Sequence, residues 1–350
     1  MLVIIFFSCI FAANKSTFSH QTTPKSFARQ KTIMNQEQCL GIDIGGTSTK
    51  IGLVTRQGEL RAFDTFPSRA RESFDWFIAD LTRHVQKLLE GQTIRGIGIG
   101  APDASPLDGT MRHAANFNWG ACVPLVEAVE KALGYPTALT NDANAAALGE
   151  WYFGVAKGMT DFVVITLGTG VGSGFVADGH LLQGKRGMAG EFGHVVVVPG
   201  GRQCSCGQRG CLEMYASARG IRLTALECVA EAGNVGPLAG YTLETMSVRK
   251  IEAAARRGDE AARRTFKISG RILGRKLADL VAIFDTEAII LSGGVSRAGD
   301  LLLKPVAENM EAFTFPAFRG KTRLLTSQMK NANAAVLGAA ALAFNVFDQK

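Results

Sequence analysis

The sequence predicts an α/β fold made of two related halves. A strand-like run, a glycine-rich turn and a second strand-like run occur at 38–54 and again at 161–176. Each is followed further along by a similar alanine-rich segment, NAAALG at Asn144–Gly149 and NAAVLG at Asn333–Gly338. Alternation of strand-like and helical segments is typical of α/β proteins. We interpret these repeated segments as an internal duplication whose second copy carries insertions.

Length and composition indicate an ordinary globular protein. A chain of 350 residues can form two domains with sizeable cores. Its 47% hydrophobic and 20% charged residues fit that class. Four of the seven excess positive charges lie in segment 1–33, which has no acidic residue, so +3 remains for the rest. This balance suits anionic small ligands and predicts no nucleic-acid partner.

The first 33 residues differ from the rest of the chain. Leu2–Ala13 is apolar but too short to cross a bilayer as a helix. No Lys or Arg precedes it, so a secretory signal is only the second interpretation. We expect residues 1–33 to be a disordered or non-native extension, with Met34 as a plausible start. We also expect a cytoplasmic protein without a membrane partner.

The first glycine turn has the composition of a phosphate-binding hairpin. Gln38–Ile44 is strand-like, Gly45-Gly46-Thr47 follows, and a second strand begins at Lys50. Glycines let backbone N–H groups approach an anion, and the threonine hydroxyl can donate as well. Asp43 could approach a phosphate only through Mg²⁺ or water. A plain hairpin is the alternative.

The next elements lead to a pair of polar residues. The apolar spacing from Ser73 predicts a helix, Ile94–Gly100 a buried strand, and Val123–Leu133 a helix stopped by Gly134. The short strand Thr137–Thr140 then places Asn141 and Asp142 at its carboxyl end, where open α/β sheets bind ligands. Asp at a helix start is also a frequent N-cap, and the two roles are compatible.

A polar and aromatic loop, Asn116-Phe117-Asn118-Trp119, lies between these elements. Amides beside an indole suit sugar recognition, although asparagines in loops more often form Asx-turns. In the second half, Gly168–Gly172 repeats the glycine turn, and helices are predicted over Ser247–Arg257 and Asp259–Phe284. The strand Glu287–Leu291 ends in Ser292-Gly293-Gly294, a turn that a phosphorylated ligand could approach, and a helix is expected from about Ser296.

A metal site is predicted in the loop 190–213. His194, Cys204, Cys206 and Cys211 follow the spacing H-x9-C-x-C-x4-C. Three thiols and one imidazole fit a closed tetrahedral zinc site. Disulfides are a weak alternative in a large chain with few cysteines. A closed site leaves no position for substrate, so the zinc would be structural, orienting the flanking carboxylates of Glu191 and Glu213.

Taken together, these motifs resemble the ROK family of sugar kinases and sugar-responsive repressors, within the actin-like ATPase superfamily. The resemblance covers about Gln38 to Phe347 and rests on DIGGT, NDAN, LGTGVG, GEFGHV…CSCGQRGCLE and LSGGV in family order. It implies a duplicated actin-like (ribonuclease H-like) fold with two domains around a central cleft. We expect a small domain at 37–155, completed by the C-terminal helix 332–347, and a large domain at 156–331.

The resemblance also implies roles for single residues. Asp142 matches the catalytic base, and the sugar contacts are Asn116, Asn141, Asp142, Glu191, His194 and Glu213. The loop at Asn116 is tighter than the family pattern, so Asn118 is the alternative there. The predicted nucleotide contacts are Asp43, Gly45, Gly46, Thr47, Lys50, Gly168, Thr169, Gly170, Gly293 and Gly294.

The implied activity is transfer of a phosphoryl group from ATP, with Mg²⁺, to a hexose hydroxyl. Glucose is the first choice because the motifs most resemble the family's glucokinases. Kinases for N-acetylmannosamine, N-acetylglucosamine or fructose are the alternatives. A repressor of the same family is disfavoured, because the residues before the first motif show no helix-turn-helix pattern. A homodimer or a dimer of dimers is expected.

Overall fold

The computed structural model describes residues 38–112, 117–329 and 331–348. The expectations for the segment 1–33 and for Asn116 therefore lie outside the described residues.

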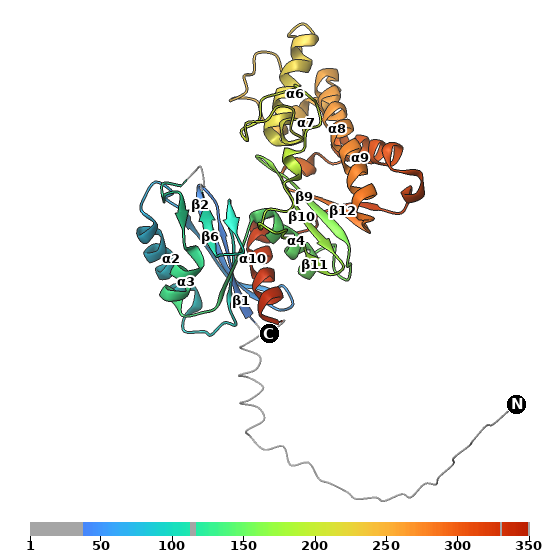
Figure 1. Ribbon diagram of the computed structural model, residues 1–350. Helices are drawn as coiled ribbons and strands as arrows, with labels where there is room; N and C mark the ends of the chain where they lie inside the picture. Colours follow the sequence, from blue (N-terminus) through green and yellow to red (C-terminus); the bar gives the residue numbers. More distant parts are fainter. Residues whose placement is uncertain (1–37, 113–116, 330, 349–350) are drawn as a thin grey trace, which may run out of the picture.

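Two five-stranded sheets with the same strand order form the centre of the molecule. The first has the order β3-β2-β1-β4-β8 and the second β11-β10-β9-β12-β13. In each sheet the first three strands are antiparallel and the last two run parallel to the third. The internal duplication predicted from the sequence is thereby confirmed (Figure 1). The strands are β1 Gln38–Ile44, β2 Ser48–Thr55, β3 Leu60–Pro67, β4 Ile97–Gly100, β8 Thr137–Thr140, β9 Phe162–Leu167, β10 Val171–Ala177, β11 His180–Leu181, β12 Ala288–Ser292 and β13 Arg323–Thr326.

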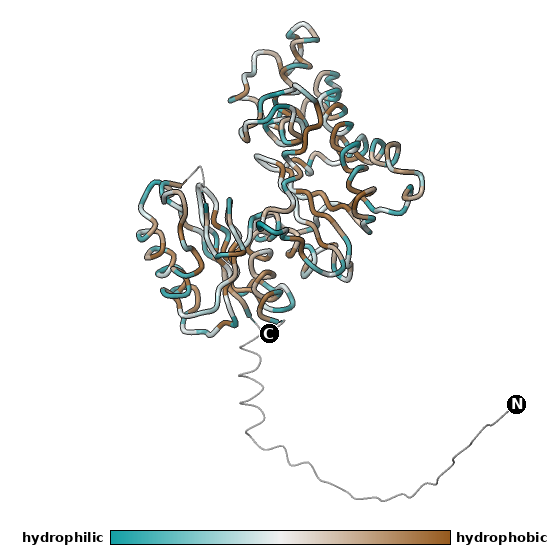
Figure 2. Tube along the Cα trace, in the orientation of Figure 1, coloured by the Kyte–Doolittle hydropathy of each residue, from teal (hydrophilic) through white to brown (hydrophobic). Residues whose placement is uncertain are grey.

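Helices cover both faces of each sheet (Figure 1). Against the first sheet pack α2 (Phe74–Leu89) and α3 (Leu125–Leu133) on one face and α10 (Asn331–Asp348) on the other. Against the second sheet packs α4 (Asp142–Phe153) on one face. Its other face carries α5 Glu213–Ala216, α6 Ala218–Glu231, α7 Val248–Arg256, α8 Glu260–Phe284 and α9 Asp300–Phe313. Apolar residues concentrate along the strands between these layers (Figure 2).

The smaller elements lie in the connections. A three-stranded sheet is formed by β5 Ala104–Ser105, β6 Thr110–Arg112 and β7 Cys122–Val123. The 3₁₀ helices are η1 Phe192–His194, η2 Val295–Ala298 and η3 Pro316–Phe318.

The two halves exchange helices. The C-terminal helix α10 packs on the first sheet, while α4, which follows β8 of the first sheet, packs on the second. Glycines make the approach possible: a Cβ atom on Gly98 would lie 1.8 Å from the carbonyl oxygen of Ala339. This exchange supports assigning 332–347 to the first domain. The boundary at residue 155 stays a proposal, with α4 at the junction of both domains.

Local sequence signals explain most helix ends. The side chains of Ser73, Ser247 and Asp259 each cap the helix that begins at the next residue. One expectation was wrong. The helix expected from Ser296 is the short η2, and α9 begins at Asp300 after Gly299, whose φ of 59° breaks the helical path.

No helix within the described ranges is long and apolar enough to cross a membrane.

Candidate functional site

A cleft of about 870 Å³ lies between the two halves. Its walls come from the ends of β1 and β9, from the residue directly after β8, from the start of α4, and from the loop that precedes η1. Sequence motifs separated by up to 250 residues therefore meet in one cavity. The predicted site residues that line it are Asp43, Asn141, Asp142, Gly168, Thr169, Gly170, Glu191, Glu213 and Gly293.

Asp142 is the first residue of α4 and opens into this cleft. The N-cap is Asn141, whose Oδ1 accepts a hydrogen bond of 2.7 Å from the backbone N–H of Asn144. Because Asn141 caps the helix, the carboxylate of Asp142 is not needed for capping and stays available to a ligand. Asn141 keeps its amide N–H₂ as a donor.

The surroundings of Asp142 favour its protonated form. The Asp142 side chain is exposed to the open cleft, but the crowded atoms of the cleft walls desolvate it and raise the pKa of its carboxyl, and the carboxylates of Asp43 and Glu191 add to this shift. The backbone N–H of Ala143 opposes it. A carboxylate whose pKa is raised is a better proton acceptor once ionised. Perturbed carboxylates in clefts are typical of functional sites.

The turn between β9 and β10 is tied to the helical side of the second half. The N–H of Gly168 donates to the carbonyl of Gly170 over 3.0 Å, which closes the turn. The N–H of Val171 donates to Oε2 of Glu213 over 3.1 Å. Glu213, predicted as a sugar contact, thus also holds the turn predicted to bind phosphate. Both features face the same cleft.

The first glycine turn is fixed by a serine that sequence reasoning missed. Ser68 is buried, and its Oγ donates to the carbonyl of Gly45 over 2.5 Å. Its backbone N–H donates to the carbonyl of Thr47 over 3.1 Å. Asp43, at the end of β1, forms an ion pair of 2.9 Å with Lys50. Asp43 lines the central cleft, whereas Lys50 does not.

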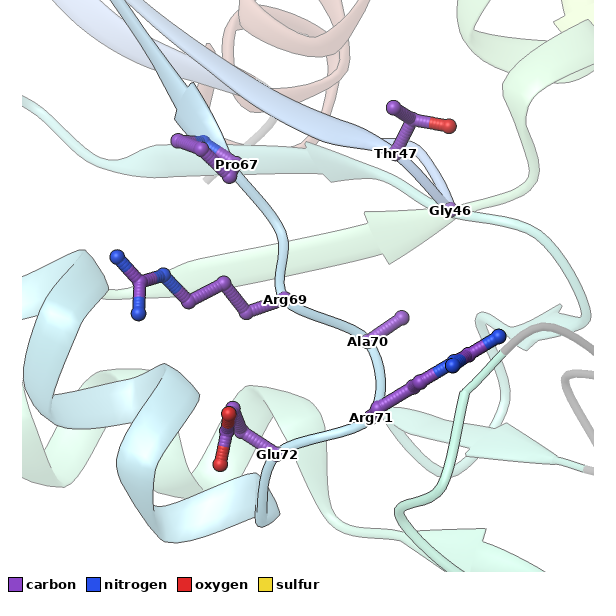
Figure 3. A pocket seen from close by; sticks show the side chains of 7 residues that line it. All are labelled: Gly46, Thr47, Pro67, Arg69, Ala70, Arg71 and Glu72. Atoms are coloured by element: carbon purple, nitrogen blue, oxygen red, sulfur yellow. The ribbon is translucent and has the colours of Figure 1, made fainter.

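Gly46 and Thr47 line a second, shallower hollow of about 780 Å³ (Figure 3). Arg69 and Arg71, from the segment between β3 and α2, line the same hollow, with the side chain of Arg69 directed away from the turn (Figure 3). The guanidinium of Arg69 stacks on the Trp76 ring, 5.0 Å from its centroid. Two cations beside a glycine turn form surroundings that attract phosphate oxygens.

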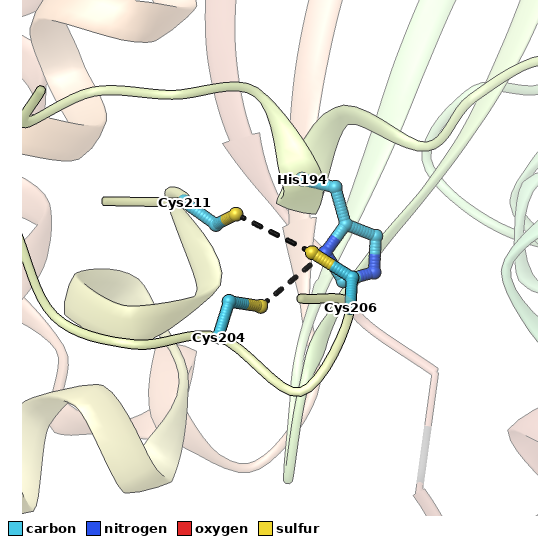
Figure 4. Close-up of side chains that lie close together, drawn as sticks. All are labelled: His194, Cys204, Cys206 and Cys211. Carbon is cyan, nitrogen blue, oxygen red and sulfur yellow. Dashed lines mark hydrogen bonds between the residues drawn. The ribbon is translucent and has the colours of Figure 1, made fainter. Parts of the chain in front are cut away.

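The four predicted metal ligands converge in the structure (Figure 4). Their ligand atoms all lie within 4.8 Å of one another. Nδ1 of His194 is 3.6 Å from Sγ of Cys204, and Sγ of Cys206 is 3.7 Å from Sγ of Cys211. A tetrahedral zinc ion with Zn–S bonds of about 2.3 Å separates its sulfurs by about 3.8 Å. A disulfide would need about 2.05 Å. The residues therefore fit zinc.

His194 presents its second nitrogen to a carboxylate. Nε2 lies 3.9 Å from Oε2 of Glu191, and His194 is not among the residues that line the cleft. If Nδ1 binds a metal, Nε2 carries the proton and points to Glu191. Glu191 itself lines the cleft. The metal loop thus reaches the cleft through its flanking carboxylates.

Several residues of the predicted sugar- and nucleotide-binding motifs do not line the central cleft. Gly45 and Gly294 do not line the central cleft. Trp119 is buried, and its ring packs on Phe74, Phe77 and Phe117 at centroid distances of 4.4–5.4 Å. Its aromatic ring therefore contributes to the core of the first half.

Other cleft residues carried no recognisable motif. Arg112 and Arg186 bring positive charge to the cleft, and Met188 exposes an apolar surface there. Thr166 also lines it, at the position in β9 that Asp43 occupies in β1. Only this internal correspondence could have revealed Thr166 from the sequence.

Comparison with known proteins finds sugar kinases that match most of this chain. A glucokinase of Halalkalibacterium halodurans is 37% identical over 291 residues, which cover 81% of this chain and 88% of that protein. An N-acetylmannosamine kinase of Escherichia coli is 34% identical, covering 87% of this chain and 97% of the relative.

Solved structures share the fold. A ROK family glucokinase from Streptomyces griseus, in complex with glucose and AMPPNP, is 35% identical with a TM-score of 0.74, covering 88% of this chain and 99% of that one. A ROK family transcriptional regulator, a homologue of the Escherichia coli MLC protein, is 28% identical with a TM-score of 0.79, covering 89% of this chain and 78% of that one.

The ROK family model matches residues 39–346, nearly all of the part described by the structure. Its relatives also show the two-domain, actin-like α/β fold that the sequence motifs predicted. The chain belongs to the ROK family.

Proposed function

We propose that this chain is an ATP-dependent hexose kinase that phosphorylates glucose, making glucose 6-phosphate. The observation that carries the proposal is the position of Asp142. Its carboxylate opens into a cleft whose other walls hold a glycine turn and further carboxylates. Phosphoryl transfer needs a base and a phosphate-binding surface in one water-poor cavity.

In the proposed mechanism Asp142 accepts the proton of the attacking hydroxyl and orients that oxygen toward the phosphate. Asn141, Glu191 and Glu213 bind the other hydroxyls of the sugar, with Asn116 and His194 as further contacts. Carboxylates accept hydrogen bonds from hydroxyl groups, and the amide of Asn141 can donate one.

At the other end of the cleft the glycine turns would bind the triphosphate. The second turn and Gly293 face the central cleft, and the first turn faces the neighbouring hollow. Closure of the two halves would bring the first turn, with Gly45, Gly46 and Thr47, onto the same phosphates. Mg²⁺ bound with ATP would neutralise phosphate charge. Asp43 would hold this ion, directly or through water, while Lys50 positions Asp43.

Zinc would act only as a structural ion. His194, Cys204, Cys206 and Cys211 would fill its four positions, so no position is open to substrate. The ion would fix the direction of the loop that presents Glu191 and Glu213.

The choice of glucose rests on the relatives. Those named glucokinase reach 37% identity, against 34% for the N-acetylmannosamine kinase. That margin leaves kinases for N-acetylmannosamine, N-acetylglucosamine and fructose as the alternatives within the class. We further propose that the protein assembles as a homodimer or a dimer of dimers, which light scattering of the purified protein measures.

The test is an ADP-release assay with ATP, Mg²⁺ and a panel of glucose, mannose, fructose, N-acetylglucosamine and N-acetylmannosamine. We expect the largest kcat/KM with glucose. A larger value with an N-acetylated sugar moves the assignment to that alternative. Absence of turnover with every sugar, together with sugar-dependent binding to DNA, would support a regulator like the MLC homologue.

A further inference from the structure

Arg202 joins the metal loop to the helices behind the cleft. It lies two residues before Cys204, and its side chain is only 14% exposed. Nη1 donates to the carbonyls of Met214 at 2.7 Å and Gly220 at 3.1 Å. The remaining N–H groups donate to Thr224 Oγ1 at 3.0 Å and to both carboxylate oxygens of Glu227 at 2.6 and 3.0 Å. All five N–H donors of the guanidinium are therefore used.

Tyr215 adds two further contacts. Its hydroxyl accepts the backbone N–H of Arg202 over 3.1 Å, and its ring lies 4.6 Å below the guanidinium carbon. A planar group with five fixed donors and an aromatic face matches this set of partners, which lysine could not satisfy. Removing it would take this donor from the buried carbonyl of Met214, which is costly, whereas the carbonyl of Gly220 would keep the hydroxyl of Thr224.

The residues that Arg202 contacts are close neighbours in sequence of the residues that hold the glycine turn of the cleft. Glu213, directly before Met214, accepts the N–H of Val171 over 3.1 Å. The N–H of Ala218 donates to the carbonyl of Gly168 over 2.9 Å. Segment 213–218 therefore touches both sides of the turn 168–171. Any shift of α5 moves Glu213 and the turn together.

The metal cluster secures only one side of this segment. Its last ligand, Cys211, lies two residues before Glu213, while Arg202 binds the residue after it. Without Arg202 the segment would keep Cys211 and its own backbone hydrogen bonds but lose the side-chain donor on the carbonyl of Met214. The contacts of Arg202 involve none of the four metal-binding side chains, so removal of the metal takes away none of these partners.

We propose that Arg202 is a positioning residue that fixes Glu213, and through it the glycine turn 168–171, independently of the metal. The inference rests on the proposed function in that Glu213 and the turn are taken to bind the hexose and ATP. Loss of the Arg202 side-chain contacts should then weaken binding of both hexose and ATP while the zinc site stays intact.

The test compares Arg202→Met with Arg209→Met, a matched substitution in the same loop. Arg209 is exposed, and among the residues that the structure describes its side chain bonds within the loop alone, to Gly200 O at 3.4 Å and Gln203 Oε1 at 3.3 Å. We expect Arg202→Met to keep one zinc per chain and to raise KM for hexose and ATP at least about fivefold, the effect of losing one hydrogen bond. Arg209→Met should behave like the parent.

Two further measurements separate positioning from general support of the fold. In the Glu213→Ala background, Arg202→Met should add little to either KM, because the carboxylate through which Arg202 acts is then absent. Additive effects would overturn the inference. So would a lowered unfolding temperature with unchanged KM values, or a loss of zinc. If Arg202→Met does not fold, Arg202→Lys replaces it, with the same outcomes decisive.

An activity-free measurement keeps this inference distinct from the proposed function. Hydrogen exchange in the peptide that contains Val171 should be faster in Arg202→Met than in Arg209→Met. Equal exchange in both variants overturns the inference. A parent protein inactive on all hexoses overturns the proposed function, and the exchange comparison then still decides whether Arg202 fixes the turn.

Discussion

A Cβ atom on Gly338 of α10 would lie 2.3 Å from the carbonyl oxygen of Ala145 in α4. At the same crossing of the two helices, a Cβ atom on Gly149 would lie 3.1 Å from the Cα atom of Gly338. The two helices that the halves exchange therefore meet backbone to backbone. Their alanine-rich repeats, which revealed the duplication, exist because larger side chains would force this junction apart.

Gly338→Ala should therefore destabilise the protein. In an ordinary helix this change stabilises by about 1 kcal/mol. Here the methyl group meets a backbone oxygen that cannot move aside, and overpacking of this kind costs about 1–3 kcal/mol. Chemical denaturation measures the free energy of unfolding. A stabilised Gly338→Ala protein would show that the helices do not touch in this way.

Asp142→Asn should raise stability at neutral pH. The pKa of Asp142 is raised in the folded state, so ionisation costs folding free energy that builds up above the ordinary pKa and is fully present above the raised one. The cost is absent at pH values below the ordinary pKa of 3.8, where the carboxyl is protonated both folded and unfolded. The gain in melting temperature should therefore be present near pH 7 and vanish toward pH 4. Thermal unfolding across this range checks it, and a loss of stability at pH 7 contradicts it.

The pH profile of activity should report the same group. Asp142 accepts a proton only when ionised, so kcat/KM should fall as the pH drops through its raised pKa. Asp43→Asn removes a neighbouring negative charge and should move this acid limb to lower pH, although it also lowers the rate. The measurement is kcat/KM against pH for both proteins. An unchanged limb would mean that another group controls it.

Removal of the metal should act on the loop. Purified protein should contain about one zinc per chain, and Cys206→Ala should lose it, lowering the free energy of unfolding by more than about 2 kcal/mol. Hexose binding should weaken because Glu191 loses its fixed direction, whereas Arg202 still fixes Glu213. Cys122→Ala is the control, since Cys122 is exposed and lies outside the cluster. Native protein without zinc would refute the metal assignment.

Much of this architecture was readable from local sequence signals. Gln38–Ile44 and Thr137–Thr140 are strands with the expected bounds, because turn residues delimit their apolar runs. The metal ligands lie close together in sequence, so their spacing alone indicated a site. The Asn141 cap follows from its place before α4, and the sequence had left that role to Asp142.

Other features depend on contacts between distant segments. Ser68, the residue directly after β3, fixes the first glycine turn, and no pattern around it signals this. The link from Glu213 to Val171 joins residues 42 positions apart. The exchange of α4 and α10 depends on close backbone contacts at Gly98 and Gly338. These contacts are possible because glycine has no side chain.

The central claim is that Asp142 is the base of a hexose kinase. The most direct measurement is kcat of Asp142→Asn beside its glucose dissociation constant, by ADP release and by calorimetry. The amide keeps the shape of the side chain but cannot take up the proton. We predict a fall in kcat of about a hundredfold or more, with glucose affinity largely retained. Near-normal turnover in a folded, glucose-binding Asp142→Asn protein would contradict the claim.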